Sequence, residues 1–266
     1  MRLNEKVAIV VGAGQQPGET IGNGRATAIR FAEEGASVLL VDKNEKLALE
    51  TLDLIENKGG KAKVQIADIT DEDDCKTIAT ACINYFGKID ILHNNVGRSE
   101  GDTGTTEMDV KVWDQLMDMN LKGMFMTCKH VLPIMRKQNS GCIINISSIA
   151  SICSHNSITY KTGKGAVNTM THHLAMENAS YGIRANAILP GLMDTPMAIE
   201  RRAREQNLHR DEVRNVRNNR VPLLKKMGTA WDVANASVFL ASEEANYITG
   251  LIMPVDGGLS AHIGGA

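Results

Sequence analysis

The stretch Lys6–Ala26, "KVAIVVGAGQQPGETIGNGRA", decides how the rest of the chain is interpreted. A short apolar run leads into a glycine-rich segment, and an alanine-rich segment with helical spacing follows it. Gly12 comes ten positions before Gly22, and Gly24 follows two positions later. Glycines between a strand and a helix let the backbone approach a pyrophosphate, and the helix N-terminus offers free N–H groups to its charge. Because the glycine spacing is irregular, this segment alone fits a plain surface loop as well as it fits a phosphate-binding loop.

Short apolar runs alternate with longer amphipathic segments along the whole chain. The runs are "KVAIVV", "SVLLV", "AKVQIA", "IDILHN", "GCIINIS", "IRANAIL" and "GLIMPV". Apolar strands that alternate with helices indicate a parallel sheet covered on both faces. We therefore predict an α/β fold, a single doubly wound Rossmann-type domain over residues 1–266 with about seven parallel strands. Residues 195–227 are polar and are expected to form a helical excursion over the sheet's edge. We call them the covering segment.

The composition excludes several classes of function. The net charge of −2 provides no basic field for nucleic acid or anionic membranes, so neither partner is expected. The N-terminus resembles neither a signal peptide nor a membrane span. The five cysteines form no C-x-x-C pair, which favours inert thiols in a reducing cytoplasm and no metal site. They are Cys75, Cys82, Cys128, Cys142 and Cys153.

Two predicted helices carry local signals. Thr70 with Asp73 three residues later is a capping arrangement that predicts a helix start. A long helix is expected from about Glu107 to Met135, with Asn120 inside it. An asparagine in mid-helix is mildly unfavourable and requires a reason.

An acidic residue follows the second predicted strand. Asp42 ends "VLLVD", eighteen residues after Gly24. A carboxylate there can accept both hydroxyls of an adenosine ribose and would repel a 2′-phosphate, which favours NAD over NADP. Lys43 weakens this argument, since a cation tolerates a phosphate, and a solvated turn acid is the alternative.

The segment "NISSIASICSHNSITYKTGK" carries the candidate chemistry. Tyr160 and Lys164 are four residues apart and so share one face of a helix that begins near Ile158. An adjacent ammonium and a positively charged nicotinamide would bring the tyrosine pKa of about 10 toward neutrality. Ser148 ends a predicted central strand, where its hydroxyl can hold a substrate oxygen. An exposed helical Tyr/Lys pair is the alternative.

With these elements in order, the sequence resembles the single-domain short-chain dehydrogenase/reductase family from about residue 4 to 260. "NNVG" (Asn94–Gly97), "PGLMDT" (Pro190–Thr195) and the C-terminal "DGG" (Asp256–Gly258) match further family elements. The resemblance places the family's catalytic tetrad on Asn120, Ser148, Tyr160 and Lys164. It implies nicotinamide-cofactor contacts from Gly12, Gly22, Asn23, Gly24, Asp42, Asp68, Ile69, Asn94, Gly97, Tyr160, Lys164 and Thr195.

The resemblance also implies a mechanism and a set of partners. Tyr160 would be the general acid/base, Lys164 would lower its pKa and bind the nicotinamide ribose, and Ser148 would polarise the substrate oxygen. Asn120 would anchor a water that links Lys164 to solvent. The implied reaction is hydride transfer between NAD and a secondary alcohol or ketone, in a homotetramer or dimer. A non-catalytic NAD-binding regulator and an enoyl reductase remain as alternatives; the latter group has a wider Tyr-to-Lys interval.

The sequence departs from the family pattern in three places. Val11 replaces the usual threonine before the first glycine, and Val96 replaces an alanine. The interval from Ser148 to Tyr160 is twelve, whereas Ser147 would give the more common thirteen. The "N-x-S-S" frame favours Ser148.

Two segments leave open questions. The covering segment holds nine Lys/Arg between residues 201 and 226, so either an arginine pairs with an anionic substrate or the helix is basic, solvated and internally ion-paired. Residues 15–21, here called the insertion loop, lengthen the glycine motif between Gly12 and Gly22. We expect its turn to project outward, so that Glu19 points away from the phosphates.

Overall fold

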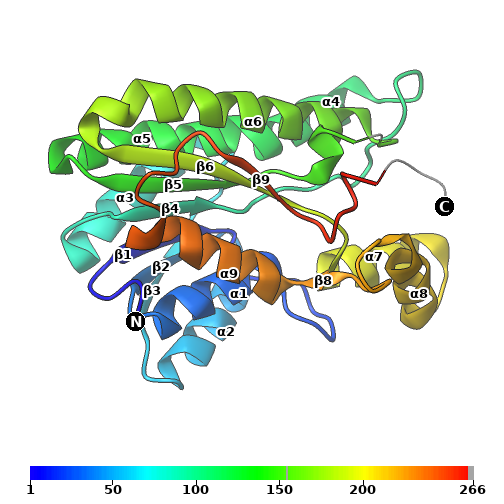
Figure 1. The fold of residues 1–266 in the computed structure, drawn as a ribbon, viewed down its shortest axis with the longest axis horizontal. Helices are drawn as coiled ribbons and strands as arrows, with labels where there is room; N and C mark the ends of the chain where they lie inside the picture. Colours follow the sequence, from blue (N-terminus) through cyan, green and yellow to red (C-terminus); the bar gives the residue numbers. More distant parts are fainter. Residues whose placement is uncertain (154, 263–266) are drawn as a thin grey trace.

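The computed structural model describes residues 1–153 and 155–262 of the chain. Seven parallel strands form one sheet in the order β3-β2-β1-β4-β5-β6-β9 (Figure 1). Their bounds are Val7–Val11 (β1), Ser37–Asp42 (β2), Lys61–Ile66 (β3), Ile91–Asn94 (β4), Gly141–Ile146 (β5), Ile183–Pro190 (β6) and Ile252–Val255 (β9). Each predicted apolar run is a strand, which confirms the predicted sheet.

Helices cover both faces of this sheet, as predicted. One face packs against α1 (Asn23–Glu33), α2 (Glu45–Glu56) and α9 (Ala230–Ala241). The other face packs against α3 (Glu72–Phe86), α5 (Gly123–Gln138) and α6 (Ile158–Asn178), with α4 (Val110–Met117) beside α6. In the described part of the chain, no helix is both long and apolar enough to cross a bilayer.

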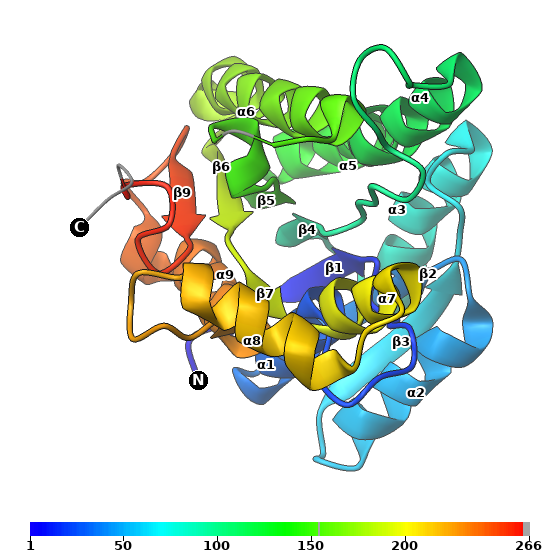
Figure 2. The same cartoon turned by 90° about the vertical axis from the view of Figure 1, so that its right-hand side faces the viewer.

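The strand order reverses between β1 and β4. From β1 the chain moves outward through β2 and β3 and then returns, so that Val11 on β1 pairs with both Val41 and Asn94. Ligands of such sheets bind beyond the carboxyl ends of the strands at this reversal. Figure 2 views the molecule from that end, where α7 (Pro196–Gln206) and α8 (Arg210–Arg220) lie in front of the sheet.

The covering segment is helical, as expected, and has a small core of its own. Ile199 on α7 packs with Val213 on α8 and with Val221 and Met227 beyond it. The short strands β7 (Met193–Asp194) and β8 (Gly228–Thr229) pair where the segment leaves and rejoins the sheet. This pairing holds α7 and α8 over the carboxyl ends of the strands.

Two local predictions needed correction. The cap of α3 is Asp71, whose side chain accepts from the backbone N–H of Asp74, so the predicted cap at Thr70 was wrong by one residue. Thr70 instead donates to Asp68. The long helix predicted from Glu107 to Met135 begins at Val110 and contains a π-helical turn, Asp118–Lys122, before α5 continues it.

Candidate active site

A cavity of about 1200 Å³ opens at the carboxyl ends of the strands, between the sheet and α7. Its wall brings together most of the residues that the sequence singled out. These are Gly12, Gly22, Asn23, Gly24, Asp42, Asp68, Ile69, Gly97, Ser148, Tyr160, Lys164 and Thr195. Asn94 and Asn120 do not line it, and both lie directly behind its wall.

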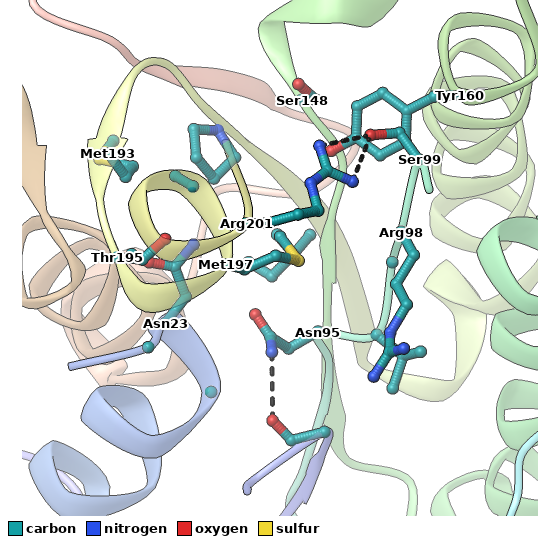
Figure 3. Close-up of a pocket in the computed structure, with 18 of the residues that line it drawn as sticks. Asn23, Asn95, Arg98, Ser99, Ser148, Tyr160, Met193, Thr195, Met197 and Arg201 are labelled. Carbon is teal, nitrogen blue, oxygen red and sulfur yellow. Dashed lines mark hydrogen bonds between the residues drawn. The ribbon is translucent and has the colours of Figure 1, made fainter. Parts of the chain in front are cut away.

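The glycine cradle is set by the close passage of α1 past β1. Gly12 has φ +81°, a conformation that side chains disfavour. A Cβ on Gly24 would lie 1.9 Å from the carbonyl oxygen of Gly12, so only glycine fits there. Asn95 donates to the same oxygen at 3.2 Å (Figure 3). The cradle therefore has the geometry that a close-lying pyrophosphate requires.

Asn23, the first residue of α1, supports the same assignment. Its side-chain oxygen is buried and has no hydrogen-bond partner among the described residues. Gly22, which precedes the helix, provides no side-chain cap, so the N–H groups of the first turn remain available. A dinucleotide cofactor therefore fits the residues present, with its phosphates at this end of α1.

The insertion loop docks on the covering segment through Glu19, while Gln15, Gln16 and Pro17 at its start line the cavity. Gln15 closes its base by accepting from the Gly22 N–H at 2.7 Å and donating to the Thr20 carbonyl at 3.2 Å. Glu19 forms ion pairs with Arg210 and with Arg214, the latter at 2.9 Å. The hydrogen bond from Arg214 is the main reason why the pKa of Glu19 lies below its ordinary value. The placement of Glu19 agrees with the expectation, whereas Pro17 of the same turn stays at the cavity wall.

The two acidic residues predicted to contact the adenosine part of the cofactor, Asp42 and Asp68, are held by hydrogen bonds. Asp42 accepts from the Gly14 N–H at 2.9 Å and from the Asn44 N–H at 3.0 Å. Burial opposes ionisation of Asp68, but hydrogen bonds from Thr70 and the charge of Lys43 outweigh it and lower its pKa. Lys43 lies 3.5 Å from Asp68, so its ammonium is directed toward that carboxylate.

Asn94 belongs to a buried polar network under the cavity. Its side chain donates to Asn145 at 3.0 Å and accepts from Thr127 at 2.8 Å. Asn145 in turn donates to Thr171 on α6. The network ties β4 and β5 to α5 and α6, which is a bracing role, and a direct cofactor contact of Asn94 stays a prediction.

Tyr160 and Lys164 project from the first turns of α6 into one corner of the cavity. The Lys164 ammonium lies 5.8 Å from the centre of the Tyr160 ring and donates to the Ile146 carbonyl at 2.8 Å. A Cβ on Gly97 would lie 2.7 Å from the Lys164 nitrogen, so this glycine makes room for the ammonium. The predicted helix start at Ile158 is confirmed.

The two adjacent serines have different environments. Ser147 is buried and donates to the Lys164 backbone carbonyl at 2.9 Å, which fixes α6 to β5. Ser148 accepts from the Ala150 N–H at 3.1 Å, so its own hydrogen stays available at the cavity wall beside Tyr160 (Figure 3). The geometry therefore supports Ser148 as the residue that meets a substrate oxygen.

Asn120 lies in the π-helical turn and is fully buried. Its amide accepts from the Arg98 N–H and donates to the Arg98 carbonyl, each at 2.8 Å. These two bonds pin the loop after β4 to the π-helical turn and explain an asparagine in mid-helix. The water relay through Asn120 stays a prediction.

Sequence reasoning missed Asp102, which holds the start of α6, the helix that carries Tyr160 and Lys164. Its carboxylate accepts from the Thr159 N–H at 3.1 Å and the Tyr160 N–H at 2.6 Å. A carboxylate at a helix N-terminus satisfies free N–H groups and the helix dipole. No local pattern could reveal it, because Asp102 lies 58 residues before Tyr160 in a loop.

The protein's own groups shift the pKa of both catalytic candidates. Burial raises the pKa of Tyr160, while Ser148 and the charges of Arg201 and Arg202 act in the opposite direction. Burial lowers the pKa of Lys164 to about 7. A lowering of the Tyr160 pKa by Lys164 therefore stays a prediction.

The Lys164 shift has a testable consequence for stability. The pKa of Lys164 is about 7 in the native protein and 10.5 in the unfolded chain. Between pH 7 and pH 10.5, Lys164 is therefore protonated to a greater extent in the unfolded chain than in the native protein. The contribution of Lys164 to the free energy of unfolding therefore increases as the pH rises above 7, by at most about 1.4 kcal/mol per pH unit. Urea unfolding of wild type and Lys164→Met at pH 7, 8 and 9 measures this slope. A constant difference between the two proteins would contradict it.

The cysteines largely match their expected inert role. Cys75, Cys82, Cys128 and Cys142 are buried. Burial raises the pKa of each of these thiols, and to about 12 for the first three. Cys153 is only partly buried and lines the cavity.

Comparison with known proteins identifies the class. Residues 19–260 match a family model described as enoyl-(acyl carrier protein) reductase. The chain is 35% identical over 262 residues to the 3-oxoacyl-(acyl-carrier-protein) reductase FabG of Thermotoga maritima, covering 97% of this chain and 99% of the relative. It is 36% identical to the 2-(R)-hydroxypropyl-CoM dehydrogenase of Xanthobacter autotrophicus, covering 96% and 99%. The crystal structure of levodione reductase superimposes with a TM-score of 0.91 at 32% identity, covering 98% and 99%.

A doubly wound sheet with a dinucleotide cradle beside a Ser/Tyr/Lys corner defines a nucleotide-dependent oxidoreductase. The chain belongs to the short-chain dehydrogenase/reductase family, whose members bind nicotinamide cofactors and act on small molecules.

Proposed function

We propose that the protein transfers a hydride between NAD and a secondary alcohol or ketone. The meeting of Ser148, Tyr160 and Lys164 in the same cavity as the glycine cradle supports this assignment. The nicotinamide cofactor supplies the hydride acceptor or donor when bound. The roles of the protein are to orient the substrate and to move one proton.

Each residue has a distinct part in the proposed proton transfer. The Ser148 hydroxyl donates to the substrate oxygen and keeps it beside the Tyr160 phenol. In oxidation the Tyr160 oxygen takes the substrate hydroxyl proton, and in reduction it returns one. In its protonated form, Lys164 favours the phenolate electrostatically.

A substrate panel with NAD and NADP, followed by nicotinamide absorbance, tests the proposal. Turnover of secondary alcohols or ketones supports it. Turnover of enoyl thioesters alone would assign the enoyl reductase alternative. Cofactor binding with no turnover across alcohols, ketones and enoyl thioesters would instead favour a non-catalytic regulator. The four-residue interval from Tyr160 to Lys164 argues against the enoyl reductase.

The NAD preference rests on Asp42. Replacing it by serine removes the carboxylate that would bind the ribose hydroxyls. We therefore expect kcat/KM for NAD to fall by about 10- to 100-fold. The value for NADP is expected to rise because a repulsive charge is removed. Kinetics with both cofactors measure the ratio, and Glu45→Gln is the control, since Glu45 is an exposed neighbouring acid outside the cavity wall. An unchanged ratio in Asp42→Ser would overturn the assignment.

We also propose that the chain forms a homo-oligomer through the outer face of α4–α6. Phe125 is 51% exposed there and lines an apolar hollow with Met117, Leu121 and Met170. Exposed apolar patches of this kind mark interaction sites. Light scattering gives the mass in solution, and Phe125→Glu is expected to lower it; a monomeric wild type would contradict the proposal.

A further inference from the structure

The arginines of the covering segment fall into two groups. The outer arginines are paired with acids: Arg210 contacts Glu19, and Arg214 contacts Glu19, Asp194 and Asp211. The Arg214–Asp211 pair is internal to the covering segment, as expected of an internally ion-paired basic helix, whereas Glu19 and Asp194 lie outside the segment. Five other arginines of the segment line the cavity. Arg204 and Arg220 are exposed at its rim, whereas the inner arginines, Arg201, Arg202 and Arg217, are partly or fully buried.

The inner arginines lack comparable partners. Among the described residues, Arg202 and Arg217 have no carboxylate within 4.0 Å. Within residues 1–153 and 155–262, the Arg202 side chain donates only to the Ala198 carbonyl of its own helix, at 3.0 Å. Arg217 is 8% exposed and contacts the sulfur of Met227 and the carbonyl of Met193. Buried cations without an anion are costly, so the wall favours a negatively charged occupant.

Arg201 brings this charge to the reacting corner. Its side chain is 16% exposed and has one acid nearby, Glu205 at 3.5 Å. Both terminal nitrogens donate to the Ser99 hydroxyl, at 3.3 and 3.2 Å. Figure 3 shows the guanidinium reaching from α7 toward Ser99, Ser148 and Tyr160. A hydroxyl is a weak partner for a guanidinium fork, which matches a carboxylate much better.

The charges also interact with one another and with the catalytic tyrosine. Burial and then the neighbouring arginines Arg202 and Arg220 lower the pKa of Arg217 to about 9. Burial and the charge of Arg201 likewise lower the pKa of Arg202. Arg201 and Arg202 are both close enough to Tyr160 to lower its pKa. The positive charge is therefore concentrated at the substrate end of the cavity.

We propose that the substrate is a small hydroxy or oxo acid whose carboxylate binds Arg201 and Arg202 while its carbinol or carbonyl oxygen meets Ser148 and Tyr160. This inference rests on the proposed oxidoreductase function and names the substrate class of the same site. Arg217, buried in the same cavity wall, adds to the positive potential. Arg201 exchanges the Ser99 hydroxyl for the carboxylate when substrate enters.

The kinetic test uses a series of hydroxy acids in which the carboxylate lies one to four carbons from a methyl carbinol. The turnover of each acid is compared with that of its methyl ester. The best acid is expected to exceed its ester about 10- to 100-fold in kcat/KM, mainly through KM. Arg201→Gln and Arg202→Gln are each expected to reduce this acid-to-ester ratio toward one. Lys226→Gln is the matched control, because it removes an exposed cation of the same segment outside the cavity wall. Equal turnover of acids and esters by wild type would overturn the carboxylate site and leave the oxidoreductase standing.

A binding arm separates the two proposals. The Tyr160→Phe variant is titrated calorimetrically, in the presence of NAD, with the acid and with its ester. We expect the acid to bind at least about 10-fold more tightly than the ester. Adding Arg201→Gln to the Tyr160→Phe variant is expected to remove this difference in affinity. Selective acid binding without turnover of any alcohol by wild type would refute the proposed reaction only. No acid selectivity in binding would refute the carboxylate site.

Discussion

Replacing Tyr160 with phenylalanine is expected to lower kcat by about 10²- to 10⁴-fold, the usual contribution of a general acid/base. The ring keeps its contacts, including the His155 ring 5.9 Å away, and only the hydroxyl is lost. Ser148 and Lys164 remain, but Ser148 is assigned to donate to the substrate oxygen and the Lys164 ammonium donates to the Ile146 carbonyl. Single-turnover kinetics with saturating cofactor measure the effect on the chemical step.

Two comparisons make this result specific. The affinity for NAD, measured by titration of the variant, is expected to stay near the wild-type value because the cradle is untouched. Tyr247→Phe removes the hydroxyl of a fully exposed tyrosine and is expected to keep kcat. A Tyr160→Phe enzyme with more than a tenth of the wild-type kcat would show that another group carries the proton.

Gly24→Ala is expected to destabilise the protein by about 1–3 kcal/mol or more, because the added carbon overpacks a rigid contact. That carbon would lie 1.9 Å from the Gly12 carbonyl oxygen and 2.6 Å from the Asn95 amide nitrogen. The first of these atoms is backbone, so α1 must move away from β1. The same movement opens the cradle, and cofactor binding is expected to be lost at concentrations that saturate wild type. Urea unfolding and cofactor titration measure the two effects.

Two other glycines separate stability from cofactor approach. In Gly22→Ala the new carbon meets the Gln15 Cβ at 3.3 Å, a milder contact than those of Gly24→Ala, so we expect a smaller loss of stability and weaker cofactor binding. A Cβ on Gly165 would have no atom of the described residues outside α6 within 4 Å. Gly165→Ala should therefore stabilise α6 by about 0.5–1 kcal/mol. A Gly24→Ala protein as stable as wild type would refute the close-approach argument.

The sheet could be predicted from sequence because its strands are buried on both sides. Segments such as Val7–Val11 and Ser37–Asp42 are short apolar runs, and the amphipathic segments between them have the period of a helix. The order of strands follows from the connections of this fold class. The cap of α3 was misassigned because Thr70 and Asp71 are adjacent and either side chain can cap a helix.

The site was predictable only where its residues are close in sequence or match a family motif. Tyr160 and Lys164 share one helix face, and Ser148 ends the adjacent strand. The contact of Asp102 with the start of α6 depends on a loop path that no local pattern encodes. The basic covering segment was visible as a charge excess, but which arginines have carboxylate partners depends on tertiary packing.

The contact between the insertion loop and α8 has a consequence for how the two ligands influence each other. The same loop ends at Gly22, the entrance of the cradle, and holds Arg210 and Arg214 through Glu19. Any displacement of α8 from the cavity must break these ion pairs and strain the loop that leads into the cradle. Substrate and cofactor affinities are then linked by a free-energy coupling that is equal in both directions. Because Glu19 is exposed, added salt screens its pairs, so ionic strength becomes a means of weakening that coupling without altering either binding site.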